Sequence, residues 1–203
     1  MLNGLRGAMT RFFTPIAKAL LRLGVSPDAV TIGGTLVVVV TALWAFPTGN
    51  FLLGTLVIAV FVLTDSLDGV MARQAGRSGP WGAFLDSTLD RFGDGAIFAG
   101  LVLWFTAGGD DRLSAVLALA CLVLGSIVPY ARARAEGLGM TASGGIAERA
   151  DRLALVLVAT FAVGVGAPTV VLTVVLGLLT LASAVTIVQR MSKVYRQAAQ
   201  VAG

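Results

Sequence analysis

Residues 65–90 read DSLDGVMARQAGRSGPWGAFLDSTLD and lie between two strongly apolar segments. This stretch places four carboxylates at regular spacing: Asp65, Asp68, Asp86 and Asp90. Residues three or four apart share one face of a helix, so each segment directs two carboxylates the same way. A carboxylate at membrane depth is costly unless it is paired or metal-bound, which makes the set a candidate functional site. Two facing pairs would form the oxygen-only cage that hard divalent cations prefer.

The composition indicates an integral membrane protein. The chain has 203 residues, of which 57% are hydrophobic and 13% are charged, and its mean hydropathy is +0.89. These values predict one all-α membrane domain over residues 1–203. Because the sequence contains no histidine, imidazole bases, histidine zinc ligands and Ser-His triads are excluded. The single cysteine, Cys121, lies in an apolar run and is predicted to be a small buried residue.

Six apolar segments separated by glycine- and proline-rich joints predict six transmembrane helices. The segments are Val30–Phe46, Phe51–Ala72, Gly82–Ala107, Leu113–Arg132, Arg149–Val165 and Pro168–Lys193. Before them, residues 1–25 form an amphipathic pattern, with Leu5, Met9 and Phe12 on one helical face and Lys18 and Arg22 on the other. This pattern predicts a helix lying in the membrane interface, ahead of a six-helix catalytic core over residues 26–203.

Basic residues predict the orientation in the membrane. They cluster before the first segment, between the second and third, between the fourth and fifth, and after the sixth, whereas the opposite side has only Arg112. The positive-inside bias therefore predicts a multi-pass plasma (inner) membrane protein with both termini and the acidic cage in the cytoplasm. The net charge of +4 thus reflects topology and suits anionic lipid or phosphate substrates, with no indication of nucleic acid.

Small and cationic residues inside the motif suit a diphosphate-linked nucleotide. Gly69, Ala72 and Gly82 leave the helix surface bare, so a flat base or a diphosphate can approach the backbone. Arg73 adds a cation that can pair with a phosphate. Two divalent ions held by carboxylates can stabilise the attacking and leaving oxygens of an in-line displacement at phosphorus. Asp90 is the candidate base for the incoming hydroxyl, and Asp94 is predicted to make a structural hydrogen bond.

The spacing D-x2-D-G-x2-A-R-x8-G-x3-D-x3-D resembles the full signature of the CDP-alcohol phosphotransferase family. The resemblance implies transfer of a phosphatidyl group from CDP-diacylglycerol to an alcohol, with release of CMP. It also implies that Asp65, Asp68, Asp86 and Asp90 hold two Mg2+ ions, with Mn2+ as the alternative, and that Asp90 is the base. For CDP-diacylglycerol the implied contacts are Gly69, Arg73, Ser78 and Gly79, with Asp28, Ala29, Val30 and Thr31 of the stretch SPDAVT at 26–31.

The acceptor is predicted from the stretches PYARARAEGLG at 129–139 and GIAERADR at 145–152. Within the family they resemble the actinobacterial phosphatidylinositol phosphate synthases, whose acceptor is inositol 1-phosphate. A phosphorylated acceptor needs cations near the cage, and Arg134, Arg152 and Lys193 are the predicted phosphate ligands. The remaining arginines of this region, Arg132, Arg149 and Arg190, are interpreted as anchors of helix ends at anionic lipid.

Two other functions fit parts of the sequence. Glycerol 3-phosphate as the acceptor would give phosphatidylglycerophosphate by the same chemistry. A divalent-cation transporter would also use intramembrane acids, but it does not need Gly69, Arg73 and Gly82, and it predicts acids at mid-membrane. The resemblance further implies a homodimer, and the small residues Gly95, Ala96, Ala99 and Gly100 would allow close helix packing.

Overall fold

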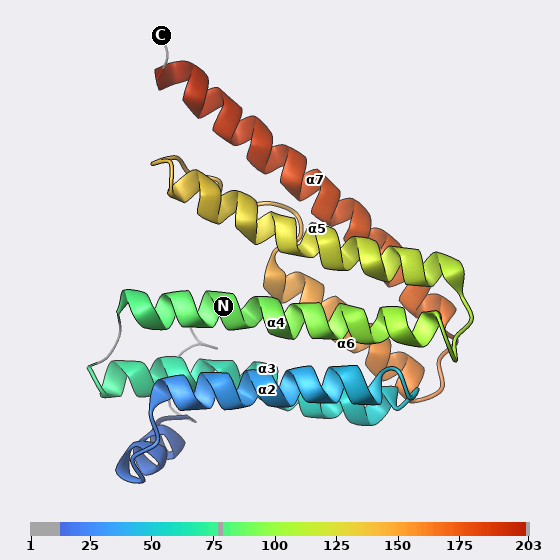
Figure 1. Ribbon diagram of the computed structural model, residues 1–203, viewed down its shortest axis with the longest axis horizontal. Coiled ribbons are helices and arrows are strands. Elements are labelled where there is room, and N and C mark those ends of the chain that lie inside the picture. The colour runs from blue at the N-terminus through green and yellow to red at the C-terminus, as the bar shows by residue number, and fades with distance from the viewer. Residues whose placement is uncertain (1–12, 77–78, 202–203) are drawn as a thin grey trace.

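The computed structural model describes residues 13–76 and 79–201, without the side chains of residues 63–66, 68 and 201. The described part is helical and contains no strand (Figure 1). A helical segment over residues 13–22 precedes six long helices. These are α2 (Pro27–Ala45), α3 (Phe51–Gln74), α4 (Pro80–Phe105), α5 (Arg112–Glu136), α6 (Arg149–Gly164) and α7 (Val170–Val201). All six predicted segments are therefore helices, with the joints where the turn residues indicated.

The helix starts follow ordinary capping chemistry. α2 has proline at its first position, and the Ser26 side chain accepts a hydrogen bond of 3.2 Å from the backbone N–H of Ala29. The helix therefore begins three residues before Val30, the first residue of the predicted segment. α5 begins in the same way, because Asp111 Oδ1 accepts a 3.1 Å bond from the backbone N–H of Ser114.

In the described part of the chain, three helices are long and apolar enough to cross a membrane: Pro27–Ala45, Arg112–Glu136 and Val170–Gln200. Among the described residues, α3 contributes a shorter apolar stretch, Phe51–Val62, before its acidic end. α4 carries four charged residues, Asp86, Asp90, Arg91 and Asp94, and α6 has only 16 residues. The residues that build the site thus reduce the apolar character of the helices that carry them.

The six helices pack as a closed ring. α2 lies against α3 and α4, α4 against α5, α5 against α7, α7 against α6, and α6 against α3. Figure 1 shows α5 and α7 diverging from α2, α3 and α4 toward the end where α7 finishes. α6 starts only partway along the ring, since residues 137–148 fold back before it begins.

The returning segment is held on α7 by side chains of that helix. Arg190 Nε donates to the carbonyl of Gly144 at 3.1 Å, and Thr186 Oγ1 accepts from the backbone N–H groups of Ile146 and Ala147 at 3.1 Å each. Farther along, Gln197 Nε2 donates to the carbonyl of Thr141 at 2.7 Å. These bonds fix the point at which the chain enters α6.

The segment over residues 13–22 packs on the end of α3. Phe13 and Ala17 are buried against Leu67, Val70 and Met71. Residues 1–12 of the predicted interfacial helix lie outside the described residues, so its placement in the membrane interface stays a prediction. Cys121 is completely buried and reduced, as the sequence indicated.

Small residues bring α2 and α4 close together. A methyl group at Gly100 would collide with the carbonyl oxygen of Ala42, whereas one at Gly95 would make an ordinary 3.8 Å contact with Leu122 Cδ1. We expect Gly100→Ala to lower the free energy of unfolding by about 1–3 kcal/mol through overpacking. Thermal unfolding in detergent measures the effect, and Gly95→Ala serves as the matched control. Equal melting temperatures for the two variants would contradict this packing role.

Candidate active site

Asp90 lies on α4 in a half-buried position beside two guanidinium groups. Its side chain is 16% exposed, and Arg149 Nη2 lies 2.8 Å from its Oδ1. Arg91 Nη2 lies 3.5 Å from its Oδ2. Arg149 is the first residue of α6, so this ion pair joins two helices that are distant in sequence. The two cations compensate the negative charge of this carboxylate in its half-buried position.

Asp94 lies one turn beyond Asp90 and engages α6 as well. Its Oδ1 accepts a 3.0 Å hydrogen bond from Arg149 Nε, and Arg152 Nη2 lies 3.8 Å from its Oδ2. The predicted structural hydrogen bond of Asp94 is therefore confirmed, with Arg149 as the donor. Asp94 thus holds the start of α6 against α4.

A small cavity of about 50 Å3 connects the start of α2 with Asp90. Its lining includes Val30 and Thr31 of the predicted nucleotide stretch, together with Asp90, Asp94 and Arg149. The neighbouring Asp28 is tied to α4, since its Oδ2 accepts a 3.0 Å hydrogen bond from Trp81 Nε1. The structure therefore brings two parts of the predicted site together, and Trp81 is a contact that the sequence did not indicate.

The other motif residues lie around the same end of α3 and α4. Asp86 is exposed on α4, and a methyl group at Gly79 or Gly82 would meet open space. At Gly69 of α3, a methyl group would lie 3.6 Å from Arg73 Nη1. The backbones of Asp65 and Asp68 belong to α3. Their side chains, and Ser78, lie outside the described residues, so the four-aspartate metal site stays a prediction.

A second cavity of about 720 Å3 lies along the first turns of α6, where it is also lined by residues of α3, α4, α5 and α7. Its wall is strongly cationic and carries one carboxylate, Glu148. The arginines of the lining come from four helices and are Arg91, Arg132, Arg149, Arg152 and Arg190. Apolar residues such as Val62 and Leu157 complete the wall. Such an excess of guanidinium groups around one cavity favours an anionic, phosphate-bearing ligand.

Arg152 is the most buried of these cations and is 2% exposed. Its Nη1 donates to the carbonyl of Ala147 at 3.3 Å and its Nη2 to that of Gly125 at 3.2 Å. Among the described residues, Nε of Arg152 and both Nε and Nη1 of Arg91 are buried without a hydrogen-bond acceptor. A buried charged donor without an acceptor is costly, so these atoms require a further acceptor, which a water molecule or a bound anion can supply.

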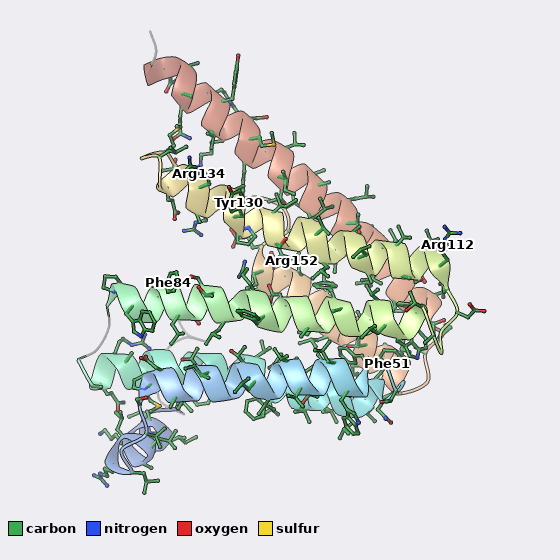
Figure 2. All side chains as sticks on the ribbon, viewed as in Figure 1. Phe51, Phe84, Arg112, Tyr130, Arg134 and Arg152 are labelled. Carbon is green, nitrogen blue, oxygen red and sulfur yellow. The ribbon has the colours of Figure 1, made fainter. Side chains whose placement is uncertain are left out.

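Of the three predicted acceptor ligands, Arg152 alone belongs to the lining of this cavity. Arg134 is exposed on the last turn of α5. In Figure 2 it lies near the end of that helix, away from Arg152 of α6. Lys193 Nζ donates to the carbonyl of Ser143 at 3.3 Å. The roles of Arg134 and Lys193 in acceptor binding therefore stay predictions.

Three arginines interpreted as membrane anchors have other surroundings. Arg190 is 5% exposed and Arg149 is paired with carboxylates, so the anchoring interpretation is wrong for both. Arg132 lines the cavity but is exposed and also pairs with Glu136 at 2.8 Å. Helical spacing offered a signal for one of them, because Arg149 and Arg152 are three residues apart and share a face.

Comparisons with known proteins identify the family. The family model described as CDP-alcohol phosphatidyltransferase matches residues 24–189. The chain belongs to the CDP-alcohol phosphatidyltransferase family. The match includes the whole motif at residues 65–90 and four of the five arginines of the large cavity, since Arg190 lies one residue beyond it. The chain is accordingly an enzyme, which sets aside the cation-transporter interpretation.

Similar members of the family share one name. A phosphatidylinositol phosphate synthase of Cutibacterium acnes is 48% identical over 203 residues, covering 97% of this chain and 98% of that protein. One of Streptomyces avermitilis is 46% identical over 201 residues, covering 96% of this chain and 82% of that protein. These similarities confirm the predicted resemblance to actinobacterial members of the family.

Solved structures of a Mycobacterium tuberculosis relative have the same fold. The crystal structure of its phosphatidylinositol phosphate synthase with CDP-DAG bound is 43% identical and has a TM-score of 0.88, covering 91% of this chain and 94% of that one. The same protein in complex with manganese and citrate has a TM-score of 0.87, covering 90% and 88% of the two chains. A metal ion and a nucleotide-linked lipid are therefore ligands of that relative.

Proposed function

We propose that this enzyme transfers the phosphatidyl group of CDP-diacylglycerol to a hydroxyl of inositol 1-phosphate, giving phosphatidylinositol phosphate and CMP. The observation that carries the proposal is the arginine-lined cavity beside Asp90, with its buried guanidinium atoms that lack an acceptor. A phosphorylated polyol satisfies those donors with its phosphate and offers a hydroxyl to the carboxylate. Two relatives, 46% and 48% identical, are named phosphatidylinositol phosphate synthase, which supports the same acceptor.

The transfer is a displacement at the phosphorus of the phosphatidyl group. The acceptor hydroxyl oxygen forms a new bond to that phosphorus, the bond to the CMP oxygen breaks, and CMP leaves with the bonding electrons. Asp90 receives the hydroxyl proton, because it lines the small cavity, pairs with Arg149 of the large cavity wall, and the chain has no histidine to serve instead. The arginine-rich wall holds the acceptor phosphate so that the hydroxyl is directed toward Asp90.

The metal site is assigned to Asp65, Asp68, Asp86 and Asp90, with two Mg2+ ions and Mn2+ as the alternative. Carboxylate oxygens suit these hard cations, and the exposed side chain of Asp86 is accessible to them. Bound divalent ions would neutralise the phosphate charge and polarise the reacting phosphorus. The manganese complex of the Mycobacterium tuberculosis relative supports a metal at this site.

The nucleotide of CDP-diacylglycerol is assigned to the end of the ring where α2 and α4 begin. The proposed contacts are Asp28, Ala29, Val30, Thr31, Gly69, Arg73, Ser78 and Gly79. Support comes from the cavity shared by Val30, Thr31 and Asp90, and from the open space beside Gly79. Arg134, Arg152 and Lys193 remain the proposed acceptor ligands, and we add Arg132 and Arg190 from the cavity wall.

In the membrane, we propose that α2 to α7 all span the bilayer, with the segment before residue 26 in the interface. Residues 1–203 then form one domain of the plasma membrane whose active site and termini face the cytoplasm. Arg112 lies at the opposite end of α5 from Arg134 in Figure 2, which agrees with the charge bias that predicts this orientation. We also propose a homodimer; within this chain, however, Ala96 and Gly100 already pack inside the helix ring.

Release of CMP by the purified protein tests the function. The protein in detergent is incubated with CDP-diacylglycerol, Mg2+ or Mn2+, and one of three acceptors: inositol 1-phosphate, free inositol or glycerol 3-phosphate. We expect rapid release with inositol 1-phosphate, little release with the other two, and none after removal of metal by a chelator. Preferential use of glycerol 3-phosphate would replace the proposed acceptor, and equal use of free inositol would contradict a phosphate-binding role for the cavity.

A further inference from the structure

Arg149 lies between the two cavities of the active site. It lines the small cavity together with Asp90 and Thr31, and it lines the large one together with Arg152 and Arg190. Its side chain is 30% exposed. Arg149 is therefore in a position to link the nucleotide side of the site to the acceptor side.

The ion pairs around Arg149 form an alternating row. Asp90 Oδ1 lies 2.8 Å from Arg149 Nη2, and Arg149 Nε lies 3.0 Å from Asp94 Oδ1. The row continues with Arg152, whose Nη2 lies 3.8 Å from Asp94 Oδ2. The side chains of Asp90 and Asp94 are only 16% and 13% exposed, so water screens these pairs less than pairs on an open surface.

The local structure of α6 does not by itself account for an arginine at this position. Arg149 is the first residue of the helix, where the positive end of the helix dipole disfavours a cation. The two carboxylates of α4 compensate for that repulsion. They also fix two edges of a planar guanidinium, which a lysine ammonium cannot reproduce. The arrangement thus defines the direction of the Asp90 carboxylate more closely than α4 alone would.

We propose that Arg149 is a positioning residue that orients the Asp90 carboxylate toward the acceptor hydroxyl, with Asp94 holding Arg149 in place. This inference rests on the proposed function, in which Asp90 accepts the hydroxyl proton. In this proposal Arg149 affects the rate of the chemical step, whereas Arg152 and Arg190 of the cavity wall bind the acceptor phosphate.

Steady-state kinetics of Arg149→Gln separate these two roles. A misplaced base lowers kcat on the order of a hundredfold, while the acceptor KM changes by less than about threefold, since the phosphate ligands remain in place. Binding of CDP-diacylglycerol without acceptor should match the wild type, whereas the melting temperature in detergent should fall slightly, because Arg149 also joins α6 to α4. Arg149→Lys should recover only part of kcat, because a single ammonium cannot fix both carboxylates.

A double-mutant cycle tests the role of Asp94. Asp94→Asn should lower kcat less than Arg149→Gln does, and the double variant should be no slower than Arg149→Gln alone, because both changes act through the same carboxylate. Arg112→Gln, at the far end of α5, controls for the loss of an arginine and should leave kcat unchanged.

Three results would overturn the inference. The first is an increase of the acceptor KM in Arg149→Gln with kcat retained, which would make Arg149 a phosphate ligand. The second is a double variant whose losses multiply, and the third is a melting temperature that falls in step with kcat. A failure of the proposed function is distinguishable, because the wild-type enzyme itself would then release no CMP with inositol 1-phosphate.

Discussion

Replacing Asp90 by asparagine is expected to abolish phosphatidyl transfer while CDP-diacylglycerol still binds. Asparagine has nearly the same shape, but it cannot accept the hydroxyl proton and is a weaker partner for a divalent cation. Loss of a general base alone lowers rates by about 10²–10⁴-fold. The proposed metal ligation by the same carboxylate increases this loss. CMP release with saturating substrates measures kcat, and binding of CDP-diacylglycerol without acceptor is measured separately.

Asp94→Asn is the matched control for this experiment. Asp94 lies on the same helix, four residues away, and accepts a 3.0 Å hydrogen bond from Arg149 that an asparagine oxygen can also accept. We therefore expect Asp94→Asn to keep measurable turnover. If Asp90→Asn turns over at nearly the wild-type rate, the base lies elsewhere, and Asp94 becomes the residue to test next.

The second large effect concerns Arg152. An arginine paired with a phosphate makes charge-assisted contacts whose loss costs about 1.5–3 kcal/mol. Arg152→Ala should accordingly raise the KM for inositol 1-phosphate by roughly ten- to a hundredfold, with little change in the KM for CDP-diacylglycerol. Initial rates measured while each substrate is varied in turn separate the two constants.

Burial requires a further control for this variant. Arg152 is 2% exposed and donates to the carbonyls of Ala147 and Gly125, so its removal also leaves buried acceptors unpaired. Arg152→Lys retains the positive charge and should lose less stability than Arg152→Ala, while still raising the acceptor KM. Equal weakening of both substrates by Arg152→Ala would place the residue in general folding or at the nucleotide, and would contradict phosphate binding.

The sequence was sufficient for the family and for the helical architecture. The spacing of the acids and glycines in residues 65–90 depends on helical periodicity, which is a local property of the chain, and the family match over residues 24–189 confirmed its interpretation. The cap of α2 at Ser26 is equally local, because it involves only neighbouring residues. The hydrogen bond of Asp94 was also predicted, although its donor was not.

The surroundings of the arginines were predicted least well from the sequence. The sequence around a basic residue at a helix end is similar whether its side chain faces lipid, solvent or a cavity. Arg190 and Arg149 were interpreted as lipid anchors, yet one is buried and the other pairs with Asp90 and Asp94. Their surroundings depend on where α6 and α7 lie relative to α4, and no short-range pattern encodes that relation.

The sequence by itself determined an acidic, metal-suited motif on membrane helices and the chemistry that such a motif performs. Only the tertiary structure decided which cations serve that motif. α6 begins partway along the helix ring, so Arg149 reaches Asp90 and Arg152 becomes enclosed between α4 and α5 (Figure 2). The physical reason is that helical periodicity relates residues three and four apart in the chain, whereas Asp90 and Arg149 come together only when α4 and α6 pack.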